Sequence, residues 1–203
     1  IPQAYGSYEE MLADPEIDVI YNSLPNNLHK EWTIKAVEAG KHVLCEKPLA
    51  MNATQARAMY AKAEAAGVKH MVCFTYRWSP IGRYLKQLVD GGYLGRCFHC
   101  RIAYIAGYGR GGQYQWKWDQ AHGLGVLGDL GSHAIDLARW YVGDITRVSA
   151  RLGAFVERPG PEGLAFDPAN DVAVLAVEFA NGALGTIEVS AVAHITRFQE
   201  KHI

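Results

Sequence analysis

The chain has 203 residues, of which 49% are hydrophobic and 20% charged, and its 20 Lys and Arg against 21 Asp and Glu give a formal net charge of −1. This balance argues against a binder of nucleic acids or anionic membranes, which needs a basic excess or cluster. No run approaches the roughly 18 apolar residues of a membrane helix, and residues 1–5 have neither the basic nor the apolar part of a signal peptide. We therefore predict a soluble protein with a sizeable core.

Helices alternate with strands in the first part of the predicted structure. In chain order we expect a helix opened by the capping box of Ser7 and Glu10, a strand at 17–21, a helix from 26 to 39, a strand at 41–45, a helix capped by Asn52 that runs to 66, and a strand at 68–74. Gly40 and Gly67 follow the two longer helices, as glycine commonly does. This alternation predicts parallel strands joined by right-handed crossovers, the doubly wound α/β class.

One part of that fold has no counterpart in the sequence. A nucleotide-binding sheet of this class begins with a strand, a glycine-rich turn and a helix, and no G-x-G-x-x-G occurs near this N-terminus. We interpret the chain as a fragment that lacks roughly the first βαβαβ half of such a domain.

The pattern changes after residue 77. We expect a helix from Pro80 to Asp90, a strand at 96–106, a glycine and aromatic loop at 107–118, a helix at 127–142, a strand at 146–156, a loop at 157–170, and two strands at 172–179 and 183–192 joined by an Asn-Gly turn. This half predicts an α+β domain with a mixed or mostly antiparallel sheet and helices on one side. The expected division is 1–77, the C-terminal part of a nucleotide-binding Rossmann domain, and 78–203, a second domain that we expect to be incomplete at its C-terminus.

Four cysteines bear on metal and redox chemistry. Cys45 and Cys73 lie in apolar strand-like runs, whereas Cys97 and Cys100 have the C-x-x-C spacing of zinc and redox sites. A structural zinc site needs four ligands, and no second closely spaced pair is nearby. Redox pairs usually open a helix, whereas this pair lies in a predicted strand. We interpret all four as reduced thiols, expect no metal, and infer a cytoplasmic protein.

Glu46 and Lys47 are the first candidates for chemistry. They directly follow a predicted parallel strand, and ligands of open α/β sheets bind beyond the carboxyl ends of the strands. A lysine held there can donate a hydrogen bond to a substrate hydroxyl or carbonyl. By position alone, a solvated Lys-Glu turn is an equally open interpretation.

A second set of candidates lies on the predicted helix at 127–142. Asp129, His133 and Asp136 are spaced by four and three residues, which places them on one helical face. A carboxylate beside an imidazole fixes its tautomer and raises its basicity, as a general base requires. A capping Asp with an ordinary His explains the spacing equally well, and a metal site would need a further ligand.

The loop at 24–29 is the third candidate. Asn26 or Asn27 is expected to cap the following helix, while the loop backbone is in place to contact a cofactor. The spacing of His29 fits either a ligand contact or an ordinary first-turn histidine.

Taken together, the runs at 18–29, 39–50 and 128–137 resemble the glucose-fructose oxidoreductase / inositol dehydrogenase (Gfo/Idh/MocA) family. Several motifs in the right order are more specific than any one of them alone. The resemblance covers essentially the whole chain. It implies an NAD(P)-dependent oxidoreductase with a Rossmann domain followed by an α/β domain, whose open sheet often forms oligomer contacts. A homodimer or homotetramer is the expected assembly.

The resemblance also implies roles for individual residues. Lys47 matches the family's catalytic lysine, Asp129 its substrate-binding aspartate and His133 its catalytic histidine. The positions that match the cofactor site are Leu24, Pro25, Asn26, His29, Glu46, Lys47 and, after the last Rossmann strand, Arg77. The implied cofactor is NAD or NADP. The choice between them stays open because the segment that sets this preference is missing from the chain.

The implied reaction passes a hydride between a nicotinamide and a secondary alcohol of a sugar or cyclic polyol. His133, oriented by Asp129, removes the hydroxyl proton while Lys47 hydrogen-bonds the same oxygen. Two alternatives remain open: an NAD-dependent glycosidase of the same architecture, and a non-catalytic sugar or dinucleotide sensor. In the aromatic loop, Tyr114, Trp116 and Trp118 are expected either to pack on a sugar ring or to form a subunit contact.

Overall fold

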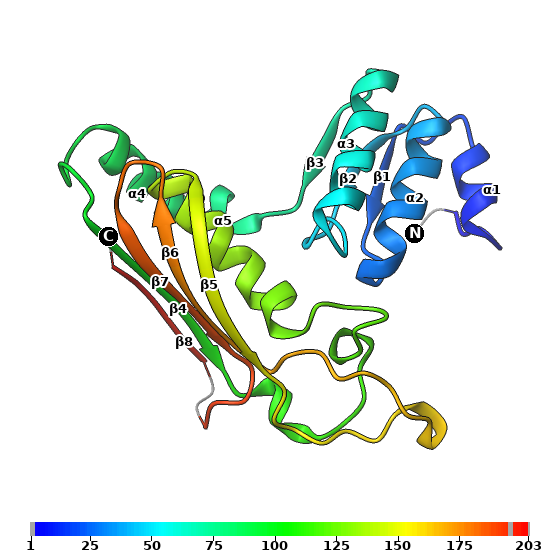
Figure 1. Cartoon of the computed structure of the whole chain (residues 1–203). Coiled ribbons are helices and arrows are strands. Elements are labelled where there is room, and N and C mark those ends of the chain that lie inside the picture. The colour runs from blue at the N-terminus through cyan, green and yellow to red at the C-terminus, as the bar shows by residue number, and fades with distance from the viewer. Residues whose placement is uncertain (1–2, 195–196, 203) are drawn as a thin grey trace. The chain divides into compact units, whose positions relative to one another are not determined.

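The computed structural model describes residues 3–194 and 197–202, and its contacts divide the chain into two compact units, Ile1–Cys73 and Phe74–Ile203 (Figure 1). Among the described residues, no helix is long and apolar enough to cross a lipid bilayer.

The first unit has the predicted alternation of helices and strands. Its elements in chain order are α1 (Tyr8–Ala13), β1 (Val19–Asn22), α2 (Asn26–Glu38), β2 (His42–Cys45), α3 (Ala53–Ala66) and β3 (His70–Val72). The described strands pair in parallel in the order β1-β2-β3. The partial doubly wound sheet predicted from the sequence is therefore confirmed, although β3 is shorter at both ends than the predicted strand at 68–74.

Local capping signals explain the helix ends of this unit. Ser7 Oγ accepts a hydrogen bond from Glu10 N at 3.1 Å, and Glu10 Oε2 accepts one from Gly6 N at 2.9 Å, so the capping box forms. Asn52 caps α3, and Gly67 ends it in the left-handed conformation with φ 66°. Ala36 and Val37 of α2 pack with Met59 and Ala63 of α3 in the core beneath β1 and β2. The apolar faces of both crossover helices thus bury one side of the sheet.

The second unit is built on a five-stranded sheet with the order β5-β6-β7-β4-β8. Its helices and strands in chain order are α4 (Pro80–Asp90), β4 (His99–Ala106), α5 (Ser132–Tyr141), β5 (Ile145–Gly153), β6 (Val172–Phe179), β7 (Leu184–Ser190) and β8 (Arg197–His202). The β4–β7 pair is parallel and the others are antiparallel, which confirms the predicted mostly antiparallel sheet. No element had been predicted at β8.

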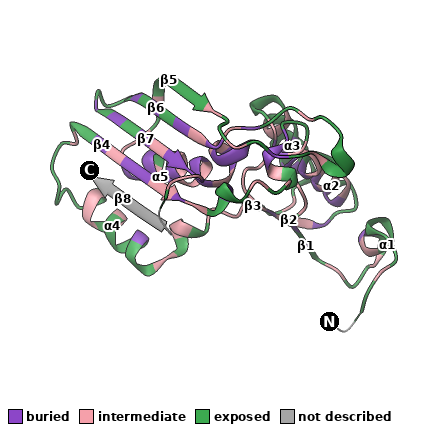
Figure 2. Cartoon of the chain, turned by 90° about the horizontal axis from the view of Figure 1, so that it is seen from below, coloured by how far each residue is buried: buried purple, intermediate pink, exposed green. Residues whose placement is uncertain are grey.

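Alternation along the strands places the core of this unit on one face of the sheet. Buried residues alternate with exposed ones along β6, which Figure 2 shows as bands of colour. The buried side chains pack with Leu137 and Ala138 of α5, while the opposite face carries charged side chains together with exposed apolar ones such as Val148, Val174 and Leu184. The hairpin forms at the predicted Asn-Gly turn, where Gly182 has φ 86° and Asn181 Oδ1 accepts from Ala183 N.

Candidate active site

In the first unit, the loops that carry the predicted site residues lie at one edge of the sheet. Residues 24–26 follow β1, and Glu46 and Lys47 follow β2, whose last residue Cys45 lies beside Asn22 of β1. Because parallel strands end at the same edge, the sequence motifs at 24–29 and 45–48 are neighbours in this unit.

His29 connects the two loops from inside. Its side chain is fully buried, with Nε2 2.7 Å from the carbonyl oxygen of Leu24 and Nδ1 3.0 Å from that of Pro48. The first contact fixes the loop after β1, and the second fixes the loop that carries Lys47. His29 therefore supports both loops from a buried position, and its contact with a cofactor stays a prediction.

Glu46 is held by two donors. The Tyr21 hydroxyl donates to Oε1 at 2.5 Å, and the backbone N–H of Lys47 donates to Oε2 at 3.1 Å. The hydrogen bond to Glu46 is the main reason why the pKa of Tyr21 is raised to about 12, with desolvation second. The carboxylate therefore has a fixed orientation beside the loop backbone.

The start of α2 corrects one prediction. Pro25, not Asn26 or Asn27, is the N-cap residue, and it makes no side-chain cap; Asn26 is already helical. The side chain of Asn22 instead holds the loop, because its Oδ1 accepts from Leu24 N at 3.3 Å. The N–H groups of the first turn are thus directed at the sheet edge without a capping side chain, an arrangement that suits polar groups of a bound ligand.

In the second unit, His133 lies in an aromatic environment. It is the second residue of α5, and its ring packs edge-on against Tyr76 at 4.8 Å and Phe74 at 6.2 Å between centroids. The Tyr76 hydroxyl donates to that of Tyr104 on β4 at 3.2 Å. The orientation of the His133 ring is therefore set by Phe74 and Tyr76, more than fifty residues earlier in the chain. The sequence does not indicate this contact.

Asp129 lies in a single π-helical turn, Leu127–Gly131, directly before α5. The helix predicted at 127–142 is therefore present, but its first turn has the wider i→i+5 hydrogen bonding of a π-helix, which the sequence did not indicate. Asn170 brackets the turn: its Oδ1 accepts from Leu127 N at 2.9 Å, and its Nδ2 donates to Leu124 O at 3.0 Å. Oδ2 of Asp129 accepts from Tyr108 at 2.7 Å and from Lys117 at 3.0 Å.

Asp136 is engaged by Arg77. The guanidinium donates from Nε and a terminal nitrogen to the two carboxylate oxygens at 2.8 and 2.7 Å, and it lies over the ring of Trp140. This two-point ion pair fixes the short helical turn Thr75–Trp78, which also carries Tyr76, against α5. Asp129, His133 and Asp136 therefore have different neighbours, although they are close in sequence.

The structure tests the sugar-packing role expected of the aromatic loop at one of its three residues, Trp118. Trp118 is 1% exposed, and its ring is covered by Tyr108 at 5.9 Å and by the Arg158 guanidinium at 4.4 Å, so its predicted packing on a sugar is wrong. Tyr114 donates to Asp119 and contacts Phe166 edge-on. The role expected of Trp116 stays a prediction.

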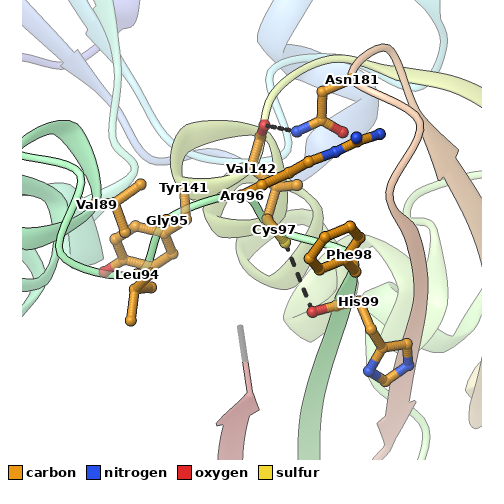
Figure 3. A pocket seen from close by; sticks show the side chains of 10 residues that line it. All are labelled: Val89, Leu94, Gly95, Arg96, Cys97, Phe98, His99, Tyr141, Val142 and Asn181. Carbon is orange, nitrogen blue, oxygen red and sulfur yellow. Dashed lines mark hydrogen bonds between the residues drawn. The ribbon is translucent and has the colours of Figure 1, made fainter.

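The C-x-x-C pair belongs to a different region. A cavity of about 420 Å³ near the start of β4 is lined by Cys97 and His99 among others, and Figure 3 shows the Cys97 thiol directed at the His99 carbonyl oxygen, 3.6 Å away. Cys100 is buried, and burial raises the pKa of its thiol to about 12. Within the described residues, no group of three or more His, Cys, Asp or Glu is arranged to hold a metal ion.

Comparison with known families accounts for nearly the whole chain. Residues 1–74 match the oxidoreductase family with an NAD-binding Rossmann fold, and residues 83–202 match the Gfo/Idh/MocA C-terminal domain. The chain belongs to the Gfo/Idh/MocA family. The resemblance seen in the sequence motifs is thus confirmed.

Individual relatives of this Gfo/Idh/MocA chain act on sugars. Levoglucosan dehydrogenase of Pseudarthrobacter phenanthrenivorans is 34% identical over 93% of this chain and 53% of its own length, and a D-xylose 1-dehydrogenase (NADP⁺) of Haloferax volcanii is 37% identical over 74% of this chain and 46% of its own. A solved levoglucosan dehydrogenase in complex with NADH and levoglucosan superimposes with a TM-score of 0.91, 34% identity, and coverage of 98% of this chain and 55% of that one. The chain spans about half the length of the curated relatives it matches.

Proposed function

We propose that this chain is part of an NAD(P)-dependent dehydrogenase that oxidises a secondary alcohol of a sugar or cyclic polyol. The observation that supports this most is the edge of the parallel sheet, where Lys47, Glu46 and the uncapped start of α2 follow neighbouring strands in a Gfo/Idh/MocA chain. Related solved proteins hold NADH with levoglucosan or L-sorbose, which favours a neutral sugar as substrate.

The residues at this edge suit the nicotinamide side of such a cofactor. Leu24, Pro25 and Asn26 supply backbone groups at the start of α2, and Glu46 supplies a carboxylate with a fixed orientation. Arg77 is engaged by Asp136, so its proposed contribution to the cofactor site is to hold its own segment in place. When bound, NAD or NADP supplies the hydride acceptor of the reaction.

The catalytic roles are those that the family resemblance implies for Lys47, Asp129 and His133. Lys47 donates a hydrogen bond to the reacting oxygen, and His133 takes the hydroxyl proton, while the C–H bond of the same carbon breaks with its electron pair leaving as hydride. A carbonyl forms, and one proton is released for each nicotinamide reduced. Asp129 binds the substrate and helps to orient His133, and His29 supports the loops that carry Leu24 and Lys47.

The test is turnover by the full-length gene product that carries this chain. Nicotinamide reduction is measured with NAD and with NADP against levoglucosan, D-xylose and a panel of polyols. His133→Ala is expected to lower kcat by about 10²- to 10⁴-fold, because proton transfer is lost. His99→Ala, an exposed histidine at the start of β4, is the matched control and should retain activity.

Two other outcomes would count against the dehydrogenase. Release of nitrophenol from a nitrophenyl glycoside, without net nicotinamide reduction, would identify the glycosidase alternative. Tight cofactor binding with no turnover of any substrate would favour a sensor. An unchanged rate in His133→Ala would remove the assigned base.

The proposal also covers the cellular compartment and the oligomeric assembly of the protein. The described cysteines are all free thiols, which supports a reducing compartment such as the cytoplasm. The face of the five-stranded sheet opposite α5 carries Val174, Leu184 and Thr186 beside charged residues, which supports assembly into a homodimer or homotetramer. Sedimentation of the full-length protein tests that assembly.

A further inference from the structure

Asp129 is held by a part of the chain that the sequence motifs did not include. The Tyr108 hydroxyl and the Lys117 ammonium both donate to the same oxygen, Oδ2, at 2.7 and 3.0 Å. Both donors come from the aromatic loop after β4, 21 and 12 residues before Asp129. Two donors from one loop on one oxygen fix the plane of the carboxylate.

The ammonium group of Lys117 is itself held in place. It lies 4.6 Å from the ring centroid of Tyr108 and 5.6 Å from that of Trp118. The side chains of Lys117 and Asp129 are each 25% exposed, so their ion pair is partly desolvated. A charge pair in such surroundings is stronger than one on an open surface, and the two rings restrict the flexible lysine stem.

The support continues below the lysine. Trp118 is buried between Tyr108 and the guanidinium of Arg158, and its carbonyl oxygen accepts from Ala169 N at 2.7 Å. Arg158 is anchored by Asp171 at 2.7 Å, with both side chains almost fully buried. Lys117 therefore lies on a layer whose members are each fixed by a further contact.

Tyr108 acts as a donor in this arrangement. Desolvation, with the negative charge of Asp129 second, raises the pKa of Tyr108, so the phenol keeps its proton and cannot compete for a positive partner. The tyrosine and the lysine thus act on Asp129 in the same direction, since each stabilises the ionised carboxylate.

We propose that Lys117, assisted by Tyr108, is a positioning residue that holds Asp129 ionised and in one orientation for binding a substrate hydroxyl. This role rests on the proposed function, in which Asp129 contacts the sugar. A carboxylate that is fixed in advance accepts a hydroxyl without first ordering itself, so the benefit is expected in substrate binding more than in the chemical step.

The experiment compares Lys117→Met with Lys117→Arg in the full-length protein, using the sugar that the wild type turns over best. Methionine keeps the length of the stem and removes the charge, and we expect KM for the sugar to rise about 10- to 100-fold, the effect of losing one charge-assisted hydrogen bond. The kcat should change less, the affinity for NAD(P) should not change, and Lys117→Arg should recover most of the loss.

Two further variants keep the result interpretable. Tyr108→Phe retains the ring beneath Lys117 and removes one donor, so a smaller rise in KM is expected. Lys86→Met removes a lysine from an exposed ion pair with Asp90 on α4 and should leave KM unchanged. Thermal melting of each variant identifies any loss of folding.

Four results would overturn the proposal. They are an unchanged KM in Lys117→Met, a loss confined to kcat, a Lys117→Arg variant as impaired as Lys117→Met, and an unchanged KM in Tyr108→Phe together with normal folding. Absence of turnover in the wild type is a different failure: it would refute the proposed function itself and this role with it.

Discussion

The loops of the two units are stabilised in different ways. In the first unit, a single buried ring, His29, connects carbonyl oxygens that lie 5 and 19 residues away in the sequence. In the second unit, the aromatic loop rests on Arg158, which donates to Gly109 O, 49 residues away, and to Asp171. Contacts of the His29 ring with two backbone carbonyl oxygens hold the first, whereas the buried ion pair of Arg158 with Asp171 holds the second.

This difference sets how each unit should respond to substitution. Loss of a hydrogen bond to a buried carbonyl oxygen leaves that oxygen unsatisfied, which costs about 1 to 3 kcal/mol. An ion pair that loses one partner leaves a buried charge, which costs about 3 to 5 kcal/mol. Substitution of a residue that supports a loop should therefore destabilise the second unit more than the first.

The largest effect is expected for Asp171→Ala. Arg158 and Asp171 are 1% and 0% exposed, and Oδ2 of Asp171 also accepts from the backbone N–H groups of Phe155 and Val156. Removing the carboxylate leaves a buried guanidinium, so we expect a loss of about 3 to 5 kcal/mol in the free energy of unfolding, measured by urea denaturation.

Two variants sharpen this prediction. Glu178→Ala removes the partner of Arg147 from an exposed pair at 3.5 Å, and its cost should be under about 1 kcal/mol. The double variant Arg158→Met with Asp171→Ala should be less destabilised than Asp171→Ala alone, because no charge remains buried. Equal losses in Asp171→Ala and Glu178→Ala would contradict the larger role assigned to the buried ion pair of the second unit.

A smaller effect is expected for His29→Leu in the first unit. Leucine fills most of the ring's volume but has no polar contact with Leu24 O or Pro48 O, so stability should fall by about 1 to 3 kcal/mol. Because both loops lose their connection, affinity for NAD(P) should weaken in the same variant, as measured by nicotinamide fluorescence.

The matched control is His70→Leu, which removes an exposed contact between the histidine Nε2 and Glu64 Oε1 at 2.8 Å. It should change neither stability nor cofactor affinity appreciably. If His29→Leu lost stability but bound the cofactor normally, the loops would be independent of this ring, and its proposed supporting role would be wrong.

The same contrast explains which features the sequence could predict. Ser7 with Glu10, Asn52 and Gly67 act within one turn of a helix, so their residue types were sufficient to predict helix starts and ends. The Asn-Gly turn of the β6–β7 hairpin is equally local. Motifs at 24–29 and 45–48 became neighbours through parallel pairing, which the alternation of elements also predicted.

Contacts across long stretches of chain gave no such signal. Lys117 and Tyr108 were noted only as parts of an aromatic loop, because nothing in their spacing indicates Asp129 as their partner. The ion pair of Arg158 with Asp171 crosses a loop that had been predicted only by its prolines. The π-helical turn at Asp129 depends on Asn170, whose position beside Leu124 and Leu127 is set by the tertiary fold.

The smallest expected effect concerns pH and again the first unit. The pKa of Tyr21 is raised to about 12, above its ordinary value of 10.0, chiefly by its hydrogen bond to Glu46. Because the folded-state pKa is the higher one, this bond stabilises the unit fully below about pH 10, and the contribution is lost as the pH rises through 12. Tyr21 is 55% exposed, so the gain in stability is small.

Titration of tyrosinate absorbance measures this directly. Other tyrosines also have raised pKa values, so the measurement is the difference between two titrations: wild type minus Tyr21→Phe should show the ionisation of one tyrosine at about pH 12. Glu46→Gln should lower the pKa of Tyr21 towards its ordinary value, because the acceptor loses its negative charge. If the difference between the two titrations showed an ordinary tyrosine pKa instead, the hydrogen bond from Tyr21 to Glu46 would be refuted, and Lys47 N would remain as the described donor that orients Glu46.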